Sequence, residues 1–428
     1  MAEDKAAESL APFNEAESFD WLRLFRCENI GPRTFQYLLK RYGSAGVALA
    51  ALPELIAKGK TGRPIRIAAI DEIEREVEAT SKLGGRFIAL CEPDYPALLR
   101  RASSAPPLIA VRGNLLSLHR SKIAIIGARN ASAAGLAFAA QLARGIGRAG
   151  HVIVSGLARG IDAKAHQSAI ETGTIAVVAG GLGNIYPAEH QNLLEQILEH
   201  GAAISEMPFG WEARGRDFPR RNRIVAGLSR AVVVVEAARR SGSLITARFA
   251  AEQGREIFAC PGSPLDPRAE GANQLLRDGA SFCTKPEDVL EALAEEDRVA
   301  RRPAAGVYEA EDAENPDEPL WDELDLPEAA GLPLVARGSQ ADPYGRNQAG
   351  ADTARLADDT PASLTPDDLS ARIAGLLGPV PVPVDDLARL AEAPARQVRT
   401  ILCGLELQGK IDWHGGDLVS ARPDAGER

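Results

Sequence analysis

The chain has 428 residues, of which 45% are hydrophobic and 40 are glycines, a composition typical of a globular α/β protein with two or three domains. No apolar run reaches membrane-spanning length, and the acidic first residues are unlike a signal peptide, so we expect a cytoplasmic protein without a membrane partner. The five cysteines are scattered and form no CxxC pair, which argues against a zinc site or disulfides. We expect neither a metal nor a cofactor.

The net charge of −10 argues against a nucleic-acid partner only if the charge is evenly spread. Residues 295–330 hold 13 acidic and 3 basic residues, so the remainder of the chain carries 46 of each and is neutral. A neutral body with clustered arginines can still present a positive surface, and the composition is therefore compatible with a DNA partner.

The first 80 residues are expected to form a helical domain, because residues 19–78 look helical. The sequence Asn29-Ile30-Gly31-Pro32 is typical of a turn that precedes a helix, and Gly43 ends the amphipathic pattern that follows. This arrangement is similar to a helix-hairpin-helix or sterile-alpha-motif-like module, although ordinary packing of short helices produces the same pattern.

Residues 81–294 alternate strands with helices. This alternation predicts a mostly parallel sheet with helices on both faces, an extended Rossmann-like and doubly wound α/β core. The expected strands are residues 87–90, 108–111, 123–126, 151–154, 175–179, 202–204, 231–235, 256–259 and 281–283.

The rest of the chain divides into two parts. Residues 295–366 are rich in Ala, Pro, Asp, Glu and Gly with little periodicity, which predicts a disordered acidic linker. In residues 367–428, three helical patterns are followed by two short strands around a His-Gly-Gly turn. Three helices and a hairpin predict a winged helix.

Three small-residue loops that follow core strands are candidates for phosphate binding, because backbone N–H groups at a helix N-terminus attract anions. They contain, in chain order, Gly127, Ala128 and Arg129; Gly156, Arg159 and Gly160; and Ser241, Gly242 and Ser243. In a parallel sheet such loops lie at the carboxyl ends of the strands. Ordinary strand-to-helix packing is the alternative explanation, but an arginine in the first loop suits a phosphate better than a dinucleotide.

The segment that begins at Phe218 combines arginines with an aromatic side chain. Phe218 precedes Arg221, Asn222 and Arg223, and more aromatic residues and arginines lie just upstream. Aromatic rings stack on bases while arginines neutralise the backbone, which is what single-stranded DNA requires, so we expect Arg129, Arg221 and Arg223 to neutralise phosphates. Taken alone, each aromatic residue is more often part of a hydrophobic core.

Asp162 and His166 lie four residues apart on one expected helix and have the chemistry of an acid–base pair. Because no nucleophile or metal cluster accompanies them, we favour a helix cap and a structural histidine.

Several strings in residues 86–293 resemble, in order, those of the DNA-processing protein A (DprA/Smf) family. They are IAIIGARNAS, VSGLARGIDAKAH, SEMPFG, FPRRNRIVAGLS, VVVVEAARRSGSLITARFAAEQGR and IFACPG. The resemblance implies a core that binds single-stranded DNA, forms a homodimer and loads RecA recombinase onto the strand during natural transformation.

The resemblance also implies roles for particular residues. The family's phosphate-binding arginine falls on Arg129, and its SGSLIT loop falls on residues 241–246. Its apolar dimer positions fall on Leu276 and Phe282. Its FPxRNR string falls on Phe218, Pro219, Arg221, Asn222 and Arg223.

Two other functions compete with this one. The core also resembles the lysine-decarboxylase-like nucleotide phosphoribohydrolases, but these place a catalytic glutamate three residues after a loop threonine, where this chain has Phe249 after Thr246. A winged-helix transcription regulator would rest on the tail alone, where acidic residues dilute the charge of Arg396, Arg399 and Lys410. We therefore expect a DNA-binding mediator that is not an enzyme.

Overall fold

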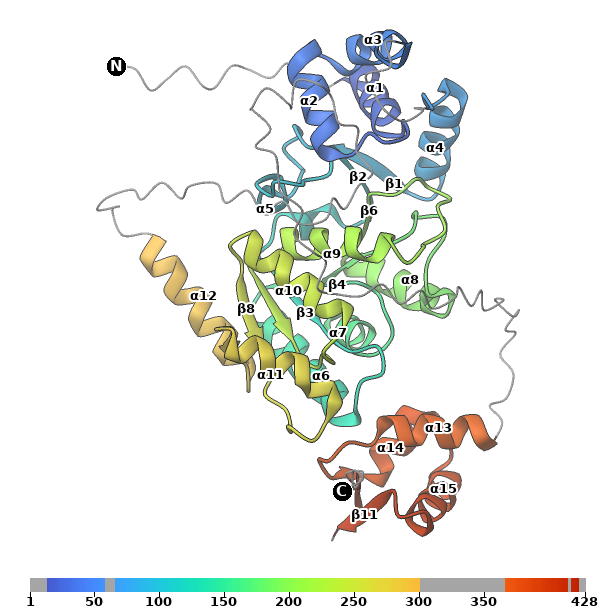
Figure 1. Cartoon of the computed structure of the whole chain (residues 1–428), viewed down its shortest axis with the longest axis vertical. Helices are drawn as coiled ribbons and strands as arrows, with labels where there is room; N and C mark the ends of the chain where they lie inside the picture. The colour runs from blue at the N-terminus through green and yellow to red at the C-terminus, as the bar shows by residue number, and fades with distance from the viewer. Residues whose placement is uncertain (1–13, 58–65, 301–365, 415–416, 423–428) are drawn as a thin grey trace, which may run out of the picture.

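The computed structural model describes residues 14–57, 66–300, 366–414 and 417–422. Figure 1 shows a helical domain at one end, a central sheet flanked by helices, and a small C-terminal domain at the other end. Among the described residues, no helix is both long and apolar enough to cross a bilayer. The same residues contain no group of three or more His, Cys, Asp or Glu side chains placed to hold a metal ion.

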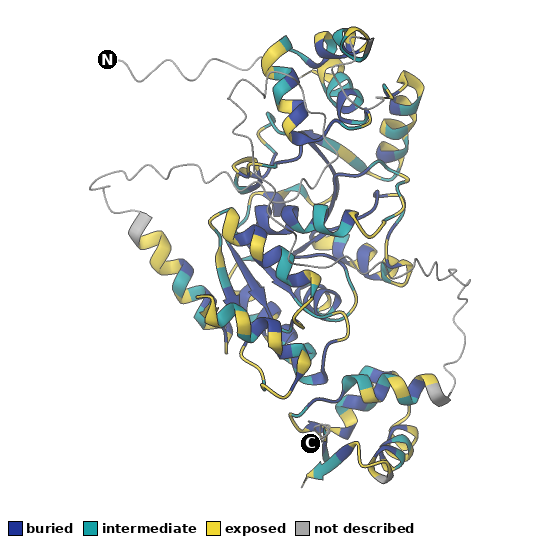
Figure 2. Ribbon diagram, in the orientation of Figure 1, coloured by how far each residue is buried: buried dark blue, intermediate teal, exposed yellow. Residues whose placement is uncertain are grey.

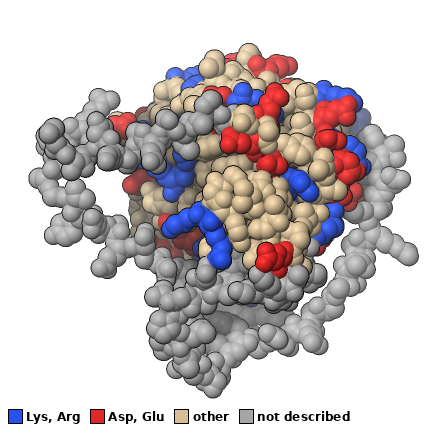
Figure 3. Space-filling view, turned by 90° about the horizontal axis from the view of Figure 1, so that it is seen from above, with Lys and Arg blue, Asp and Glu red and all other residues tan. Residues whose placement is uncertain are grey.

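The N-terminal domain consists of four helices, α1 (Glu15–Phe25), α2 (Pro32–Tyr42), α3 (Ala45–Ala57) and α4 (Ile70–Lys82). Local signals set their ends. Asn14 and Glu17 form a capping box at the start of α1, Pro32 opens α2, and Gly43 ends it with a φ of 79°. Seen from this end of the molecule, basic and acidic side chains are interspersed and form no single positive field (Figure 3). The predicted helical domain is confirmed.

Nine strands form one sheet in the order β1-β2-β6-β5-β4-β3-β7-β8-β9. They are β1 (Gly85–Ala89), β2 (Leu108–Gly113), β3 (Lys122–Ile126), β4 (Val152–Ser155), β5 (Thr174–Val177), β6 (Ala202–Ser205), β7 (Ala231–Val234), β8 (Glu256–Ala259) and β9 (Ser281–Phe282). All pairs from β6 to β9 are parallel, whereas β2 pairs antiparallel with both β1 and β6. Each strand overlaps one that the sequence predicts.

Helices cover both faces of this sheet, as the sequence predicts. One face packs against α6 (Ala133–Arg148), α7 (Ile161–Ala169) and α12 (Pro286–Ala300). The other packs against α9 (Asp217–Leu228), α10 (Gly242–Glu252) and α11 (Glu270–Arg277). The central strands, β3 to β7, lie fully buried between the two layers (Figure 2). Burial on both faces explains their unbroken apolar runs.

The direction of winding reverses beside β3. From β3 the chain adds β4, β5 and β6 on one side, and it then returns to add β7, β8 and β9 on the other. In doubly wound sheets, ligands bind outside the carboxyl ends of the strands at this reversal. The loops that follow β3, β4 and β7 are therefore the place to look for a site.

The C-terminal domain is a winged helix, as predicted. It consists of α13 (Pro366–Leu376), β10 (Val382–Pro383), α14 (Val384–Ala391), α15 (Ala395–Leu407), β11 (Ile411–His414) and β12 (Leu418–Ala421). Arg268 of the core joins it to the rest of the molecule by donating hydrogen bonds to the carbonyl oxygens of Gly375 (2.9 Å) and Leu377 (2.7 Å) at the end of α13. A cation suits this end of a helix.

The expected boundaries of the linker differ from the structure at one end. Helix α12 continues to Ala300, so the first six residues of the predicted linker, 295–300, are helical. Arg230 of the core donates hydrogen bonds to Glu296 and Asp297, which ties these acidic residues to the core. The remainder of the linker, 301–365, lies outside the described residues.

Candidate nucleic-acid interface

The three predicted phosphate loops meet at the carboxyl ends of β3, β4 and β7, and we call residues 127–130, 156–160 and 241–243 the loop rim. Ser243 Oγ donates to the carbonyl oxygen of Gly127 at 2.8 Å. Gly160, with a φ of 75°, packs against the backbone of Ala128 and Arg129 so closely that a Cβ atom would lie 2.3 Å from the Ala128 oxygen. Glycine is therefore required there by both conformation and space.

Arg129 is exposed on the loop rim and lies beside an aromatic ring that is itself one of a pair. Its guanidinium carbon is 4.8 Å from the centre of the Phe218 ring. That ring makes an edge-to-face contact with Tyr186, which is 48% exposed, at a centroid distance of 5.5 Å. A cation stacked on an aromatic pair combines a phosphate partner with a surface for bases.

Arg159 is the second exposed arginine of the loop rim. It makes two hydrogen bonds of 2.7 Å to Glu189, a bidentate pair in which both side chains are at least half exposed. The Arg159 guanidinium lowers the pKa of Glu189 through these hydrogen bonds. Exposed pairs of this kind contribute little to stability, and a phosphate can replace the carboxylate at little cost.

Arg221 lies beneath the loop rim rather than on it. Its guanidinium donates to the carbonyl oxygen of Val177 at 3.2 Å and lies 3.9 Å from a carboxylate oxygen of Asp162. A Cβ atom on Gly156 would overlap this guanidinium. Asp162 in turn accepts hydrogen bonds from the amides of Gly156 and Ala158. Arg221 and Asp162 thus support the second loop from below.

Arg223 is buried further inside, with 1% of its surface exposed. It forms an ion pair with Glu206 and donates to the carbonyl oxygen of Ser104. The expectation that Arg221 and Arg223 neutralise phosphates directly must be revised, because neither guanidinium reaches the surface. Asn222, between them, donates to the Gly242 carbonyl oxygen at 3.2 Å and ties α9 to the third loop.

The N-terminus of α6 is also occupied by the protein itself. Glu236, just after β7, accepts hydrogen bonds from the backbone amide of Ser132 (2.9 Å) and from its hydroxyl group. A Cβ atom on Gly135 would lie 2.5 Å from the same carboxylate. A phosphate on this loop therefore has to rely on Arg129 and not on the first turn of α6. Sequence reasoning missed Glu236 because nothing local indicates where its side chain points.

The structure separates the members of the possible acid–base pair. His166 is fully buried and its Nδ1 lies 2.8 Å from the hydroxyl oxygen of Thr174, while Asp162 faces the second loop. Burial lowers the pKa of His166 to about 3, so the ring is neutral at physiological pH. Phe249, where the phosphoribohydrolases would have glutamate, is buried in the core.

The two residues expected in a dimer interface lie at the far edge of the sheet. Phe282 is 64% exposed on β9, the edge strand. Leu276, at the end of α11, is half-buried. An exposed aromatic residue on an unpaired edge is a feature of surfaces that bind another chain.

Comparisons with known proteins agree with the three domains of the fold. Residues 86–294 match the family model of DNA recombination-mediator protein A, residues 15–79 a DprA-like N-terminal HHH domain, and residues 357–417 a DprA winged helix domain. DNA processing protein DprA of Bacillus subtilis is 40% identical over 227 residues, which cover 52% of this chain and 76% of that protein. Protein Smf of Escherichia coli is 44% identical over 202 residues, 46% of this chain, but the match spans only about half (54%) of its length.

Two solved structures are also similar. DprA of Streptococcus pneumoniae is 37% identical, with a TM-score of 0.49, and the match covers 52% of this chain and 77% of that one. DprA of Helicobacter pylori, which was studied for its single-stranded DNA binding mode, is 28% identical, with a TM-score of 0.46 and coverage of 49% and 96%.

Proposed function

Since the chain belongs to the DprA/Smf family of DNA recombination-mediator proteins, we propose that it binds single-stranded DNA at the loop rim and helps to load RecA recombinase onto it. The observation that supports this most is the stack of Arg129, Phe218 and Tyr186, in which the first and last side chains are exposed and Phe218 is half-buried, and which offers one strand both a cation and aromatic surfaces. A duplex hides its bases and would use only the cation. Binding should therefore favour single strands.

The proposed mechanism is electrostatic and geometric and needs no catalytic group. Arg129 and Arg159 neutralise phosphates, while Phe218 and Tyr186 stack on bases of any identity. The buried residues below hold the loops in place, so little ordering accompanies binding. Because these contacts involve phosphates and the faces of bases, the affinity should depend on salt more than on sequence.

Pairing of two subunits through Leu276 and Phe282 is part of the proposal. A dimer would place two loop rims on one strand, so that the second contact forms at a high effective concentration. Phe282→Arg, an exposed position, should yield monomers on size exclusion, and Leu276→Arg should do the same. If both variants stay dimeric, the interface lies elsewhere.

The central test is a titration of fluorescent single-stranded and duplex DNA at two salt concentrations. Arg129→Ala should weaken binding of the single strand and reduce the slope of log K against log salt by about 0.7, the contribution of one phosphate contact. Arg148→Ala is the matched control, because Arg148 is exposed in the last turn of α6, about 24 Å along the helix from its rim end. Equal slopes for Arg129→Ala and the unchanged protein would remove Arg129 from the interface.

RecA loading and the absence of catalysis are tested separately. The rate at which RecA assembles on single-stranded DNA should rise when the protein is added and should rise less with Arg129→Ala. Incubation with nucleoside monophosphates should release no free base. Release of base would favour a nucleotide-processing enzyme instead.

A further inference from the structure

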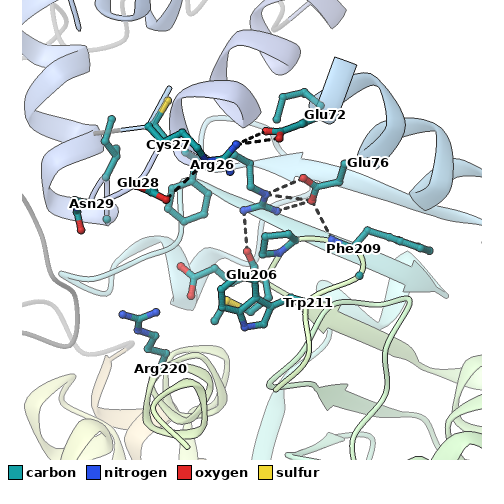
Figure 4. A pocket seen from close by; sticks show the side chains of 18 of the residues that line it. Arg26, Cys27, Glu28, Asn29, Glu72, Glu76, Glu206, Phe209, Trp211 and Arg220 are labelled. Carbon is teal, nitrogen blue, oxygen red and sulfur yellow. Dashed lines mark hydrogen bonds and ion pairs between the residues drawn. The ribbon is translucent and has the colours of Figure 1, made fainter. Parts of the chain in front are cut away.

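A large pocket lies between the N-terminal helical domain and the core, and none of the residues so far assigned to DNA lines it. Its volume is about 910 Å³. One wall comes from the end of α1, the turn before α2, and α4. The other comes from residues 206–211, 214 and 216, between β6 and α9, and from Arg220 in α9 (Figure 4). The volume is within the usual range for small-molecule sites, roughly 300–1,000 Å³.

The two walls are held in a fixed relation. Arg26, at the end of α1, forms an ion pair with Glu76 of α4 at 2.8 Å, and both side chains are about nine-tenths buried. The same guanidinium donates to the carbonyl oxygen of Glu206 at 3.1 Å, and the amide of Phe209 donates to Glu76 at 3.3 Å. These bonds cross from one domain to the other, as Figure 4 shows, so the pocket is preformed.

Trp211 is fixed as part of the core wall. Its indole N–H donates to a carboxylate oxygen of Asp217 at 2.9 Å, and the amide of Arg214 donates to the same oxygen at 2.9 Å. The Arg214 guanidinium lies 4.8 Å from the Trp211 ring. Asp217 is fully buried and begins α9, so it anchors both residues to the helix that also carries Phe218.

The charges that line the pocket leave a positive excess. Each of its acidic residues has an arginine partner: Glu28 and Glu72 with Arg66, Glu76 with Arg26, and Glu206 with Arg223. Arg214 and Arg216 are exposed and have no ion-pair partner among the described residues. The pocket therefore favours an anion that also has an aromatic surface to stack on Trp211.

We infer that this interdomain pocket binds a nucleoside phosphate, with the base beside Trp211 and the phosphate between Arg214 and Arg216. Where the nucleotide belongs to a DNA strand, this inference rests on the proposed binding of single-stranded DNA. Phe218, which stacks on Arg129 of the loop rim, and Asp217, which holds Trp211, are consecutive residues in the first turn of α9, which spans only about 5.4 Å. A strand that leaves the rim over this turn would place its next nucleotides in the pocket.

A binding series tests this inference on the full chain. Oligothymidylates of increasing length are titrated against the unchanged protein, the double variant Arg214→Glu/Arg216→Glu, and Arg148→Glu as a matched control on a distant surface. The affinity for long oligonucleotides should fall at least tenfold in the double variant, while the affinity for the shortest that bind the rim should change less than twofold. Arg75→Ala, on the helical wall, should give a smaller loss of the same kind.

The source of the nucleotide is distinguished by a second arm with thymidine monophosphate. If the double variant loses affinity for long oligonucleotides and the unchanged protein does not bind thymidine monophosphate, the pocket holds part of a DNA strand. If the unchanged protein binds thymidine monophosphate and the double variant does not, the pocket holds a free nucleotide. An unchanged length dependence together with no monophosphate binding would overturn the inference. If the unchanged protein binds no single-stranded DNA at all, the proposed function fails, and the monophosphate arm still decides on the pocket.

Discussion

Arginines above and below the loop rim have opposite surroundings. Arg129 is exposed and stacks on Phe218, whereas Arg221 and Arg223, in the helix that begins beside that phenylalanine, are buried against carboxylates and carbonyl oxygens. The exposed arginine can exchange its partner for a phosphate. The two buried arginines cannot, because moving a buried guanidinium leaves the carboxylate of Glu206 or Asp162 without a counter-charge. One motif thus supplies both the support of the site and a part of its surface.

Of the variants considered, Arg223→Met should destabilise the folded protein most. Glu206 would remain buried without its partner, so the free energy of unfolding should fall by about 3–5 kcal/mol. Urea denaturation followed by circular dichroism measures it. Arg129→Met, which removes an exposed guanidinium, should change stability by less than about 0.5 kcal/mol. The double variant Arg223→Met/Glu206→Leu should recover much of the loss; equal losses in the two single variants would contradict the division into layers.

Gly156→Ala should disturb both layers at once. The added methyl group would overlap the Arg221 guanidinium, and displacing it should cost about 1–3 kcal/mol of stability. Because the second loop would shift with it, DNA affinity should fall as well. Gly404→Ala, in α15 of the C-terminal domain, is the control, since a Cβ atom there meets no neighbour within 4 Å. A stable, fully binding Gly156→Ala protein would show that Arg221 is not a fixed support.

His166 makes the stability of the buried residues beneath the loop rim depend on pH. Its pKa of about 3 in the folded protein lies below the ordinary value of 6.5, so between these values the unfolded chain binds more protons and stability falls as pH decreases. From pH 7 to pH 5 this group should cost the protein about 2 kcal/mol. His166→Gln does not titrate and should lose correspondingly less over the same interval. Parallel losses in the two proteins would show that His166 is not responsible.

Phe218→Leu should have the smallest effect on folding and should act mainly on binding. Loss of one stacking surface should weaken single-stranded DNA binding by about 1–3 kcal/mol, with the slope against salt nearly unchanged because no cation is removed. Fluorescence titrations at two salt concentrations measure both. A changed slope with unchanged affinity at low salt would mean that Phe218 acts only by positioning Arg129.

The features of the fold that the sequence predicts correctly are local ones. Apolar runs mark the buried strands, helical spacing marks both flanking domains, and the small-residue loops at residues 127–130, 156–160 and 241–243 follow β3, β4 and β7 as expected. Each of these depends on neighbours along the chain, since periodicity, caps and turns are set within a few residues. The same signals identify the loops as a group, because parallel strands bring their carboxyl ends to one edge.

Only the tertiary structure decides which arginine does what. Arg221 and Arg223 differ from Arg129 in burial, and burial depends on partners such as Asp162 and Glu206 that are distant in sequence. For the same reason, neither the Glu236 carboxylate at the start of α6 nor the pocket between the domains could be foreseen. The type of a residue limits the chemistry that it can perform. Its use depends on the local dielectric environment and on its partners, and both are set only when distant segments pack together.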